Sequence, residues 1–322
     1  MYTRTKICSL LFVLLFFAGT AIAQTIVVAR DGSGHFKTVQ EAIDAVKDSS
    51  TQVTTIFIKN GTYKEKLCLS ETKMNVHFTG ESVEGTILTY DDYASKKDSE
   101  GKNIGTTGSS SFFIFGAGFY AENITFENAA GPVGQAVAVR VTGDRAIFIN
   151  CRFLGFQDTL YTQGSDSRQY YFKCYIEGTV DFIFGAATCL FDSCILYGKK
   201  GGYFTAASTP RHKKFGYVFR NCRLSGEAAP NSFFLGRPWQ PFAKVVFMNC
   251  AMDTIIHSKG WDNWGKEDNE KTAFFAEYGN YGNGAATTNR VGWSKILSKE
   301  AAEEFMPVNI LSGWEPRRQM RE

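Results

Sequence analysis

A short motif that recurs through the middle of the chain limits the folds available to it. An aromatic residue stands three positions before a cysteine in five segments, FINC (148–151), YFKC (171–174), FDSC (191–194), FRNC (219–222) and FMNC (247–250). Successive cysteines are 23, 20, 28 and 28 residues apart, and in the first four segments a glycine follows the cysteine by four positions. A unit of this length, built from β-branched and aromatic runs without helical periodicity, predicts a solenoid of short strands.

We therefore expect an all-β protein, a right-handed, single-stranded parallel β-helix with one coil per unit. The leucine scaffold of a leucine-rich repeat is absent, and a propeller blade would need a longer unit. Equivalent residues of neighbouring coils would stack at ~4.8 Å, so the cysteines would form a column of small buried groups. One or two disulfides among them are the open alternative. AENITF (121–126) fits as an earlier coil, with Ile124 at the cysteine position.

Two short capping helices are expected near the ends of the stack, where strand edges need cover. Thr38 and Glu41 form a capping box, and apolar residues at helical spacing follow as far as Val46. This helix should plug the first coil. Residues 299–305 predict a second helix at the other end, with Ser298 as its N-cap. Because no Pro- or Ser-rich linker interrupts the sequence, we expect one domain over 24–322.

Residues 1–23 have the pattern of a cleavable signal peptide. Arg4 and Lys6 precede an apolar stretch, and Ala21-Ile22-Ala23 supplies the small-x-small cleavage pattern. The apolar stretch is short for a membrane span of ~20 residues, so an uncleaved anchor is the weaker alternative. We expect a secreted or periplasmic monomer with no membrane contact after cleavage. The 35 Lys and Arg against 32 Asp and Glu are too even for a nucleic-acid partner.

Two acids occupy equivalent places in neighbouring units. Asp158 lies seven residues after Cys151, and Asp181 lies seven residues after Cys174. Their side chains should stack about one strand spacing apart, which raises the pKa of one of them. Such a pair supplies one ionised carboxylate that can attack and one protonated carboxyl that can donate. The alternative is an acidic pair on a solvated face.

Four blocks of sequence, in order, resemble the signature blocks of the pectin methylesterases. They are GPVGQAV (131–137), GFQDTLY (155–161), GTVDFIFGAA (178–187) and LGRPW (235–239). Similar features at 29–46, 61–67 and 293–297 extend the resemblance over nearly all of 24–322. It implies the β-helix again, and a pectinesterase: an aspartyl carbohydrate esterase that hydrolyses the methyl esters of polygalacturonate (methyl-esterified homogalacturonan, pectin) to pectate and methanol. Its role would be pectin degradation and cell wall modification.

The resemblance also implies a role for each catalytic residue. Asp181 matches the nucleophile and Asp158 the general acid, which then acts as base for the water that opens the acyl-enzyme. Gln135 and Gln157 match the oxyanion donors, and Arg237 matches the arginine that orients the nucleophile. The plainer alternatives are amides that cap strand ends and an arginine in a surface ion pair.

Four further residues are expected to bind substrate. Trp239 matches an aromatic platform for a sugar ring, with core packing as its alternative. Tyr161 and Phe182 would line the cleft together with Phe184, although a β-helix also buries many aromatics. Thr106 resembles a substrate-contacting threonine. We expect no metal and no cofactor, because a carboxylate attacks and amides hold the oxyanion.

Several other functions compete with this interpretation. A pectate lyase or polygalacturonase would need clusters of acids that are absent from the sequence, and a non-catalytic carbohydrate-binding protein has no need of the acid pair. A serine esterase lacks its GxSxG elbow here. A thioesterase or other esterase on the same site stays open. Since the signal leads directly into the first block and residues 204–219 differ from the plant pattern, we expect a bacterial-type, single-domain member.

Overall fold

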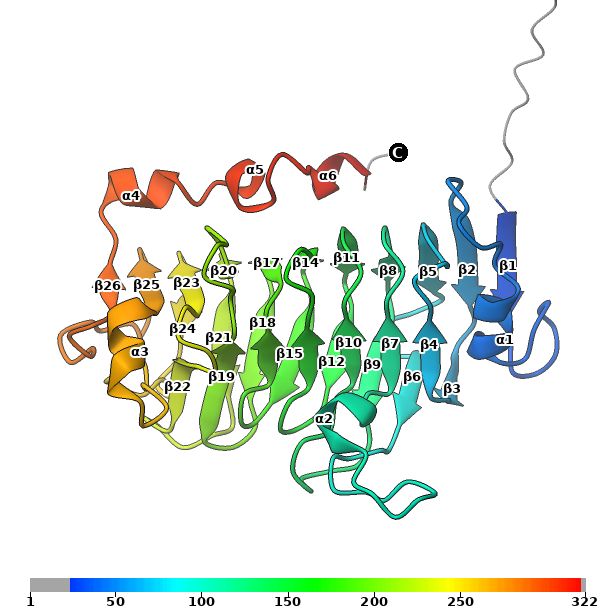
Figure 1. The fold of residues 1–322 in the computed structure, drawn as a ribbon, viewed down its shortest axis with the longest axis horizontal. Helices are drawn as coiled ribbons and strands as arrows, with labels where there is room; N and C mark the ends of the chain where they lie inside the picture. Colours follow the sequence, from blue (N-terminus) through cyan, green and yellow to red (C-terminus); the bar gives the residue numbers. More distant parts are fainter. Residues whose placement is uncertain (1–23, 320–322) are drawn as a thin grey trace, which may run out of the picture.

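The chain forms an elongated stack of coils, shown in Figure 1, in a computed structural model that describes residues 24–319. The predicted signal peptide and Cys8 lie outside the described residues. The described strands form parallel sheets of eleven, eight and seven strands, and a typical coil contributes one strand to each. The predicted parallel β-helix is therefore confirmed.

Each sheet runs along the stack, and most strands pair with the strands three places before and after them in chain order. The eleven-stranded sheet consists of β1 (Gln24–Val28), β2 (Thr54–Ile58), β5 (Val76–Gly80), β8 (Tyr120–Glu122), β11 (Ala146–Ile149), β14 (Arg168–Phe172), β17 (Thr188–Asp192), β20 (Tyr217–Arg220), β23 (Lys244–Met248), β25 (Phe274–Tyr278) and β26 (Lys295–Ile296). The eight-stranded sheet consists of β3 (Gly61–Lys64), β6 (Thr86–Tyr90), β9 (Thr125–Asn128), β12 (Arg152–Leu154), β15 (Tyr175–Gly178), β18 (Ile195–Gly198), β21 (Arg223–Gly226) and β24 (Ala251–Met252). The seven-stranded sheet consists of β4 (Leu67–Leu69), β7 (Phe112–Ile114), β10 (Val139–Val141), β13 (Leu160–Thr162), β16 (Ile183–Gly185), β19 (Gly202–Ala207) and β22 (Phe233–Pro238).

The repeated motif has a structural explanation at each of its positions. The residue before each cysteine has a left-handed backbone, with φ of 47° at Asn150 and 54° at Asn221. It makes a sharp corner between the eleven- and eight-stranded sheets, and asparagine tolerates that conformation better than most residues. The glycine is also required, because a Cβ at Gly226 would lie 2.1 Å from the carbonyl oxygen of Gly198.

The cysteines form the predicted column inside the stack. Strand register places them beside one another, with Ile124 at the equivalent place one coil earlier. All members are almost fully buried, and each of the seven described cysteines is free. The alternative of disulfides among the described residues is therefore wrong. The column members are Cys151, Cys174, Cys194, Cys222 and Cys250.

The aromatic residue of the motif forms a second column. Consecutive rings are stacked at centroid distances of 5.0, 4.6, 4.5 and 4.4 Å, with interplanar angles of 12° or less. Offset-stacked pairs contribute about 0.5–1.5 kcal/mol each beyond the area they bury. The aromatic position of the repeat is therefore explained by ring stacking inside the β-helix. The rings belong to Phe148, Tyr171, Phe191, Phe219 and Phe247.

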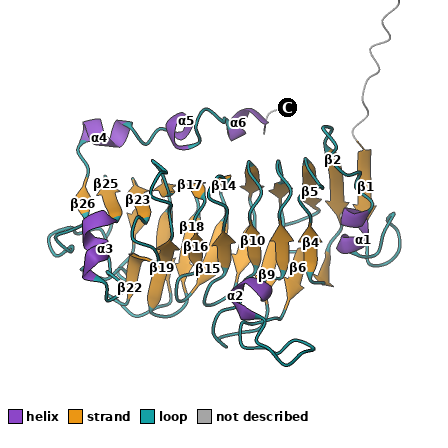
Figure 2. Ribbon diagram, in the orientation of Figure 1, coloured by secondary structure: helices purple, strands orange, loops and turns teal. Residues whose placement is uncertain are grey.

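Short helices cover parts of the stack (Figure 2). Helix α1 (Val39–Asp44) has the predicted capping box and packs against the first coil. Helix α4 (Lys299–Glu303) begins at Ser298 as predicted. The remaining helices are α2 (Gly105–Gly108), α3 (Glu267–Thr272), α5 (Pro307–Ile310) and α6 (Pro316–Gln319). Within residues 24–319, none of the helices is both long and apolar enough to cross a membrane.

The expectation that the second helix closes the far end of the stack is wrong. Helices α4, α5 and α6 instead run back along the stack beside the eleven-stranded sheet (Figure 1). The outer face of that sheet carries apolar side chains, including Tyr170 and Leu190, and the C-terminal segment buries them with Phe305 and Leu311. Covering this face removes its apolar side chains from water, which favours this path for the C-terminal segment.

Candidate active site

A groove lies along the outer face of the seven-stranded sheet. Strand register places one outward residue per coil in a row, from Arg140 on β10 through Tyr161, Phe184 and Ala206 to Arg237 on β22. The groove contains all the predicted site residues except Phe182. Its lining consists of Gly105, Thr106, Thr107, Gln135, Gln157, Asp158, Tyr161, Asp181, Phe184, Ala206, Arg237, Trp239 and Trp264.

The two acids occupy the same position in successive coils, as their spacing predicted. Leu160 pairs with Ile183, so Asp158 and Asp181 both stand two residues before the paired position. Both have left-handed backbones, with φ of 65° and 54°, a conformation that costs roughly 1–3 kcal/mol outside glycine. Their exposures of 8% and 5% exclude the alternative of an acidic pair on a solvated face.

Asp181 is held by Arg237 in a two-pronged ion pair. The arginine Nε donates to Oδ1 at 2.9 Å, and its Nη2 donates to Oδ2 at 2.7 Å. Two rings that the sequence did not predict lie against the guanidinium, with centroids at 4.0 Å for Tyr203 and 3.8 Å for Trp264. The arginine side chain is only 19% exposed, so the alternative of an ordinary surface ion pair is wrong. These contacts fix the orientation of the Asp181 carboxylate.

The surroundings separate the two carboxyls in acidity. Burial and then the charge of Asp181 hold the pKa of Asp158 well above its ordinary range. Burial also raises the pKa of Asp181, but the hydrogen bonds and charge of Arg237 oppose that rise. Asp181 is therefore the carboxyl that ionises more readily, and Asp158 is the one that keeps its proton.

Two neutral amides stand beside the acids. Gln135 and Gln157 are joined by a parallel bridge, and the carbonyl of Gln157 accepts a hydrogen bond from the Ala136 backbone at 3.1 Å. Neither side chain forms a hydrogen bond with another residue of 24–319, so neither caps a strand end. Both amide groups are free to donate to an oxygen placed in the groove.

Aromatic side chains form one floor of the groove. Tyr161 stacks on Phe184 with the ring centroids 4.2 Å apart, and the ring centroids of Trp239 and Phe184 are 5.9 Å apart. Trp239 is partly buried and also lines the groove, so core packing alone does not describe it, and its role as a platform for a sugar ring stays a prediction. The prediction for Phe182 is wrong: its side chain is fully buried against Phe204. It packs over Gly178, where a Cβ would lie 2.3 Å from its own Cβ.

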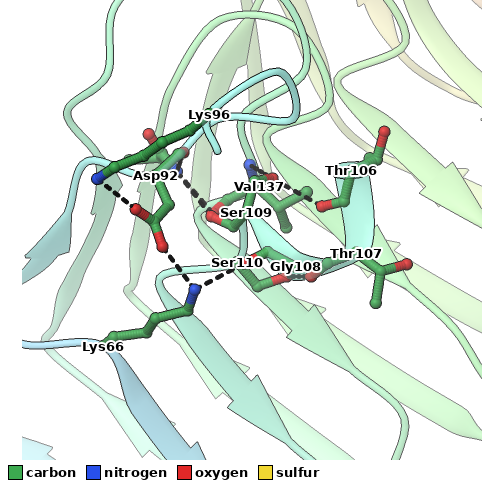
Figure 3. Close-up of polar contacts among 10 residues, drawn as sticks. Lys66, Asp92, Lys96, Thr106, Thr107, Gly108, Ser109, Ser110 and Val137 are labelled. Carbon is green, nitrogen blue, oxygen red and sulfur yellow. Dashed lines mark hydrogen bonds and ion pairs between the residues drawn. The ribbon is translucent and has the colours of Figure 1, made fainter. Parts of the chain in front are cut away.

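Thr106 reaches the groove from α2, which a polar network holds in place (Figure 3). The buried Asp92 accepts from Lys66 at 2.5 Å and from Lys96 at 2.6 Å. Lys66 also donates to the carbonyl of Gly108, the last residue of α2, at 2.8 Å.

Ser109 ties the same helix to the strand that follows Gln135. Its hydroxyl donates to the Thr106 carbonyl at 2.6 Å and accepts from the Val137 backbone at 3.2 Å (Figure 3). The Asn128 amide adds bonds to the carbonyls of Asp92, Ser109 and Val137. The predicted threonine is thus fixed beside the predicted oxyanion donors.

The arrangement is that of an acyl-transfer site. An ionisable carboxylate, a carboxyl that retains its proton and two neutral donors converge in one groove, which matches the parts such a reaction needs. No group of three or more His, Cys, Asp or Glu side chains within residues 24–319 is placed to hold a metal ion.

Sequence reasoning missed Trp264 and Thr107, which line the groove, and Tyr203, which contacts Arg237. Tyr203 is on β19, and Thr107 belongs to α2. Trp264 lies in the loop before α3, where an Asx turn from Asp262 holds it at φ 63°. Its coil has no regular spacing from the others, so the repeat gave no signal for it.

Comparison with known proteins gives a consistent result. The family described as Pectinesterase matches residues 25–314. Pectinesterase 31 of Arabidopsis thaliana is 43% identical over 89% of this chain and 92% of its own length, whereas the chain spans about half (51%) of Pectinesterase 5 from the same plant. The solved pectin methylesterase from carrot superposes with a TM-score of 0.84 and 33% identity, over 93% of this chain and 97% of the other. A pectin methylesterase solved in complex with a hexasaccharide superposes with a TM-score of 0.79 and 33% identity, over 92% of this chain and 99% of the other. The chain belongs to the pectinesterase family.

Proposed function

We propose that this chain hydrolyses the methyl esters of pectin through an acyl-enzyme on Asp181. The observation that carries the proposal is that the two buried acids differ in how readily they ionise. Asp181 is oriented and favoured as an anion by Arg237, while Asp158 has no ion-pair partner within residues 24–319 and a pKa well above its ordinary range. A nucleophile and a proton donor are thereby present together before substrate arrives.

In the first step, a carboxylate oxygen of Asp181 attacks the C6 carbonyl of a methyl-galacturonate. The negative charge that develops on the carbonyl oxygen is stabilised by the amides of Gln135 and Gln157, which are neutral donors with no other partner. The C6–methoxy bond then breaks, and Asp158 gives its proton to the departing oxygen, so that methanol leaves. The product is an anhydride between Asp181 and the sugar acid.

In the second step, water opens the anhydride. Asp158, now ionised, takes a proton from the water as its oxygen bonds to the galacturonyl carbon. Asp181 departs as the carboxylate held by Arg237, and Asp158 has regained its proton. The net reaction consumes one water and yields methanol and a galacturonate, whose own proton passes to solvent.

The substrate assignment is supported by the family and by the shape of the site. The groove is open and lined by Tyr161, Phe184, Trp239 and Trp264, surfaces against which sugar rings pack well. A related pectin methylesterase has been solved with a hexasaccharide. We propose methyl-esterified homogalacturonan as the partner of this groove, with one chain acting as a monomer.

Two finer assignments rest on sequence alone. We propose export to the periplasm or the medium, because residues 1–23 have the features of a signal peptide. The assignment to bacterial-type members depends on residues 204–219 alone. The solved relatives include a plant protein from carrot and a bacterial one from Erwinia chrysanthemi, so this assignment stays a prediction.

The test is methanol release from highly methylated pectin by the purified protein. We expect steady release that is proportional to enzyme and is accompanied by acidification as carboxyls form. A folded protein that releases no methanol from pectin, but hydrolyses a thioester or another carboxylic ester, would overturn the substrate assignment.

A further inference from the structure

Two turns in neighbouring coils carry the acids of the proposed chemistry, and each turn begins at a glycine. Gly155 opens the turn that leads to Gln157 and Asp158, and Gly178 opens the equivalent turn that leads to Asp181. The relative position of the two turns decides whether both acids reach one substrate, because a reaction between bound groups depends on their alignment.

Lys199, which follows β18 in the next coil, forms hydrogen bonds with both turns. Its backbone N–H donates to the Gly178 carbonyl at 2.9 Å, in the turn of Asp181. Its side-chain ammonium donates to the Gly155 carbonyl at 3.3 Å, in the turn of Asp158. One residue is therefore bonded to the equivalent carbonyls of two successive turns.

The ammonium of Lys199 is fixed by two further contacts. It donates to Oε1 of Glu177 at 2.9 Å, and it lies 3.7 Å from the ring centroid of Phe156. The side chains of Lys199 and Glu177 are only 20% and 16% exposed. An ammonium has three N–H donors, so a carboxylate, a carbonyl and a ring face account for its capacity. Lys199 thereby contacts both residues that precede Gln157.

We propose that Lys199 is a positioning residue, which holds the turn of Gln157 and Asp158 in place against the turn of Asp181. This inference rests on the proposed function and adds a residue to it. Lys199 does not line the groove, so it acts through Gly155 and Phe156 and not on the substrate. Removing the ammonium releases Phe156 and the Gly155 carbonyl, and the groups of Gln157 and Asp158 lose their alignment with the nucleophile.

Two other lysines provide matched controls. Lys200 is the next residue in the chain, is exposed, and its side chain makes no hydrogen bond or ion pair with any residue of 24–319. Lys295 lies 4.7 Å from the ring centroid of Phe274 and does not line the groove. If the loss of one positive charge or of one contact with a ring were enough, these lysines would respond to substitution as Lys199 does.

The experiment compares wild type with Lys199→Met, Lys200→Met and Lys295→Met in methanol release from highly methylated pectin, per folded molecule. For Lys199→Met we expect kcat to fall by about 10–10²-fold, the scale of a misplacement of about 1 Å. Its KM should change less than about twofold, because Gln157 and Asp158 act in the transition state. Both constants of the two control variants should stay within about twofold of wild type.

A second arm combines Lys199→Met with Gln157→Ala. Part of the effect of Lys199 passes through Gln157, and that part is already lost when Gln157 is absent. The double variant should therefore keep at least about threefold more activity than the product of the two single losses predicts. A general structural role for Lys199 would instead give losses that multiply.

A folded Lys199→Met with wild-type kcat, a rise in KM alone, equal falls in the control variants or losses that multiply would each overturn the role of Lys199. If Lys199→Met does not fold, Phe156→Leu takes its place, since it removes only the ring from the contact and should lower kcat in the same manner. Wild-type kcat in folded Phe156→Leu would show that the inference is wrong. Absence of methanol release by wild type is a different result, because it overturns the proposed function itself.

Discussion

Two ion pairs in the molecule join an arginine to a buried carboxylate, yet their surroundings differ. One is Arg237 with Asp181 in the groove, and the other is Arg290 with Glu277. Arg290 and Glu277 have side-chain exposures of 4% and 2%, against 19% and 8% for the groove pair. Arg290 donates to both Glu277 oxygens, at 2.7 and 3.3 Å, and Asn280 adds a third bond. Further donor groups of Arg290 bind the carbonyls of His257, Ser258 and Gly284.

Asp181, by contrast, receives side-chain hydrogen bonds from Arg237 alone among the described residues. Its remaining lone pairs face a groove that substrate can enter. The difference teaches that burial and pairing do not by themselves indicate catalysis. Glu277 accepts hydrogen bonds from two residues and faces no groove, so it stabilises the fold. Asp181 is held in place by Arg237 but keeps lone pairs that face the groove, so it can attack a substrate.

The largest expected effect is on the stability contributed by the pair of Arg290 and Glu277. Glu277→Ala leaves the Arg290 cation buried without compensation, which should lower the free energy of unfolding by about 3–5 kcal/mol. Urea unfolding followed by circular dichroism measures this loss, and the activity per folded molecule should stay at the wild-type value. A loss below about 1 kcal/mol would remove the structural half of the comparison.

The second prediction extends the comparison to glutamines. Gln157 has a free amide in the groove, whereas the buried Gln169 donates to the Val141 carbonyl and to Ser167 and accepts from Tyr171. Gln157→Ala should lower kcat by about 10²–10³-fold, the usual effect of removing an oxyanion donor, with little change in stability. Gln169→Ala should cost stability and leave kcat unchanged. Comparable kcat values for wild type and Gln157→Ala would show that Gln157 is no oxyanion donor.

The smallest expected effect on stability concerns Asp158, a buried carboxyl with no cation bound to it. Its folded pKa is raised above the ordinary 3.8, so the folded protein binds this proton more tightly than the unfolded chain does. That contribution to stability is complete below the ordinary pKa and is lost as pH rises through the folded value. Asp158→Asn lacks this loss, so its stability relative to wild type should improve with rising pH.

Urea unfolding of both proteins at about pH 4 and about pH 8 measures the difference. A stability difference that is the same at the two pH values would contradict the raised pKa of Asp158. The methanol assay provides a second readout, because the variant has no proton to give and should lose activity by about 10²–10⁴-fold.

Much of the fold could be predicted because the repeat records interior packing directly. Each coil needs an aromatic ring, a corner residue and a small buried group at fixed places, and the spacing of Cys151 and Cys174 therefore set the phase of Asp158 and Asp181 correctly. The path of the C-terminal helices could not be predicted in this manner. It depends on apolar residues such as Leu190 on the outer face of a sheet, and the sequence pattern does not separate inner from outer apolar positions.

The site followed the same division. Residues within the repeating coils, such as Gln157 and Arg237, lie in the groove as expected. Of the two phenylalanines expected in the cleft, Phe184 lines the groove and Phe182 is buried, because Phe182 directly follows the bend at 179–181, where the alternation of side chains is interrupted. Trp264 was missed because it comes from a loop outside the repeat and contacts Arg237 only through the tertiary fold.

Replacement of Asp181 is the most direct test of the claim that this carboxylate, held by Arg237 and facing the groove, is the nucleophile. Asp181→Asn keeps the shape of the side chain and removes its charge, and Asp192→Asn is the control, since Asp192 is equally buried and pairs with Arg317 away from the groove. We predict that methanol release from highly methylated pectin falls by at least about 10³-fold in folded Asp181→Asn and is unchanged in Asp192→Asn. Release by Asp181→Asn within about tenfold of wild type would contradict the account, because Asp181 would then not be the nucleophile.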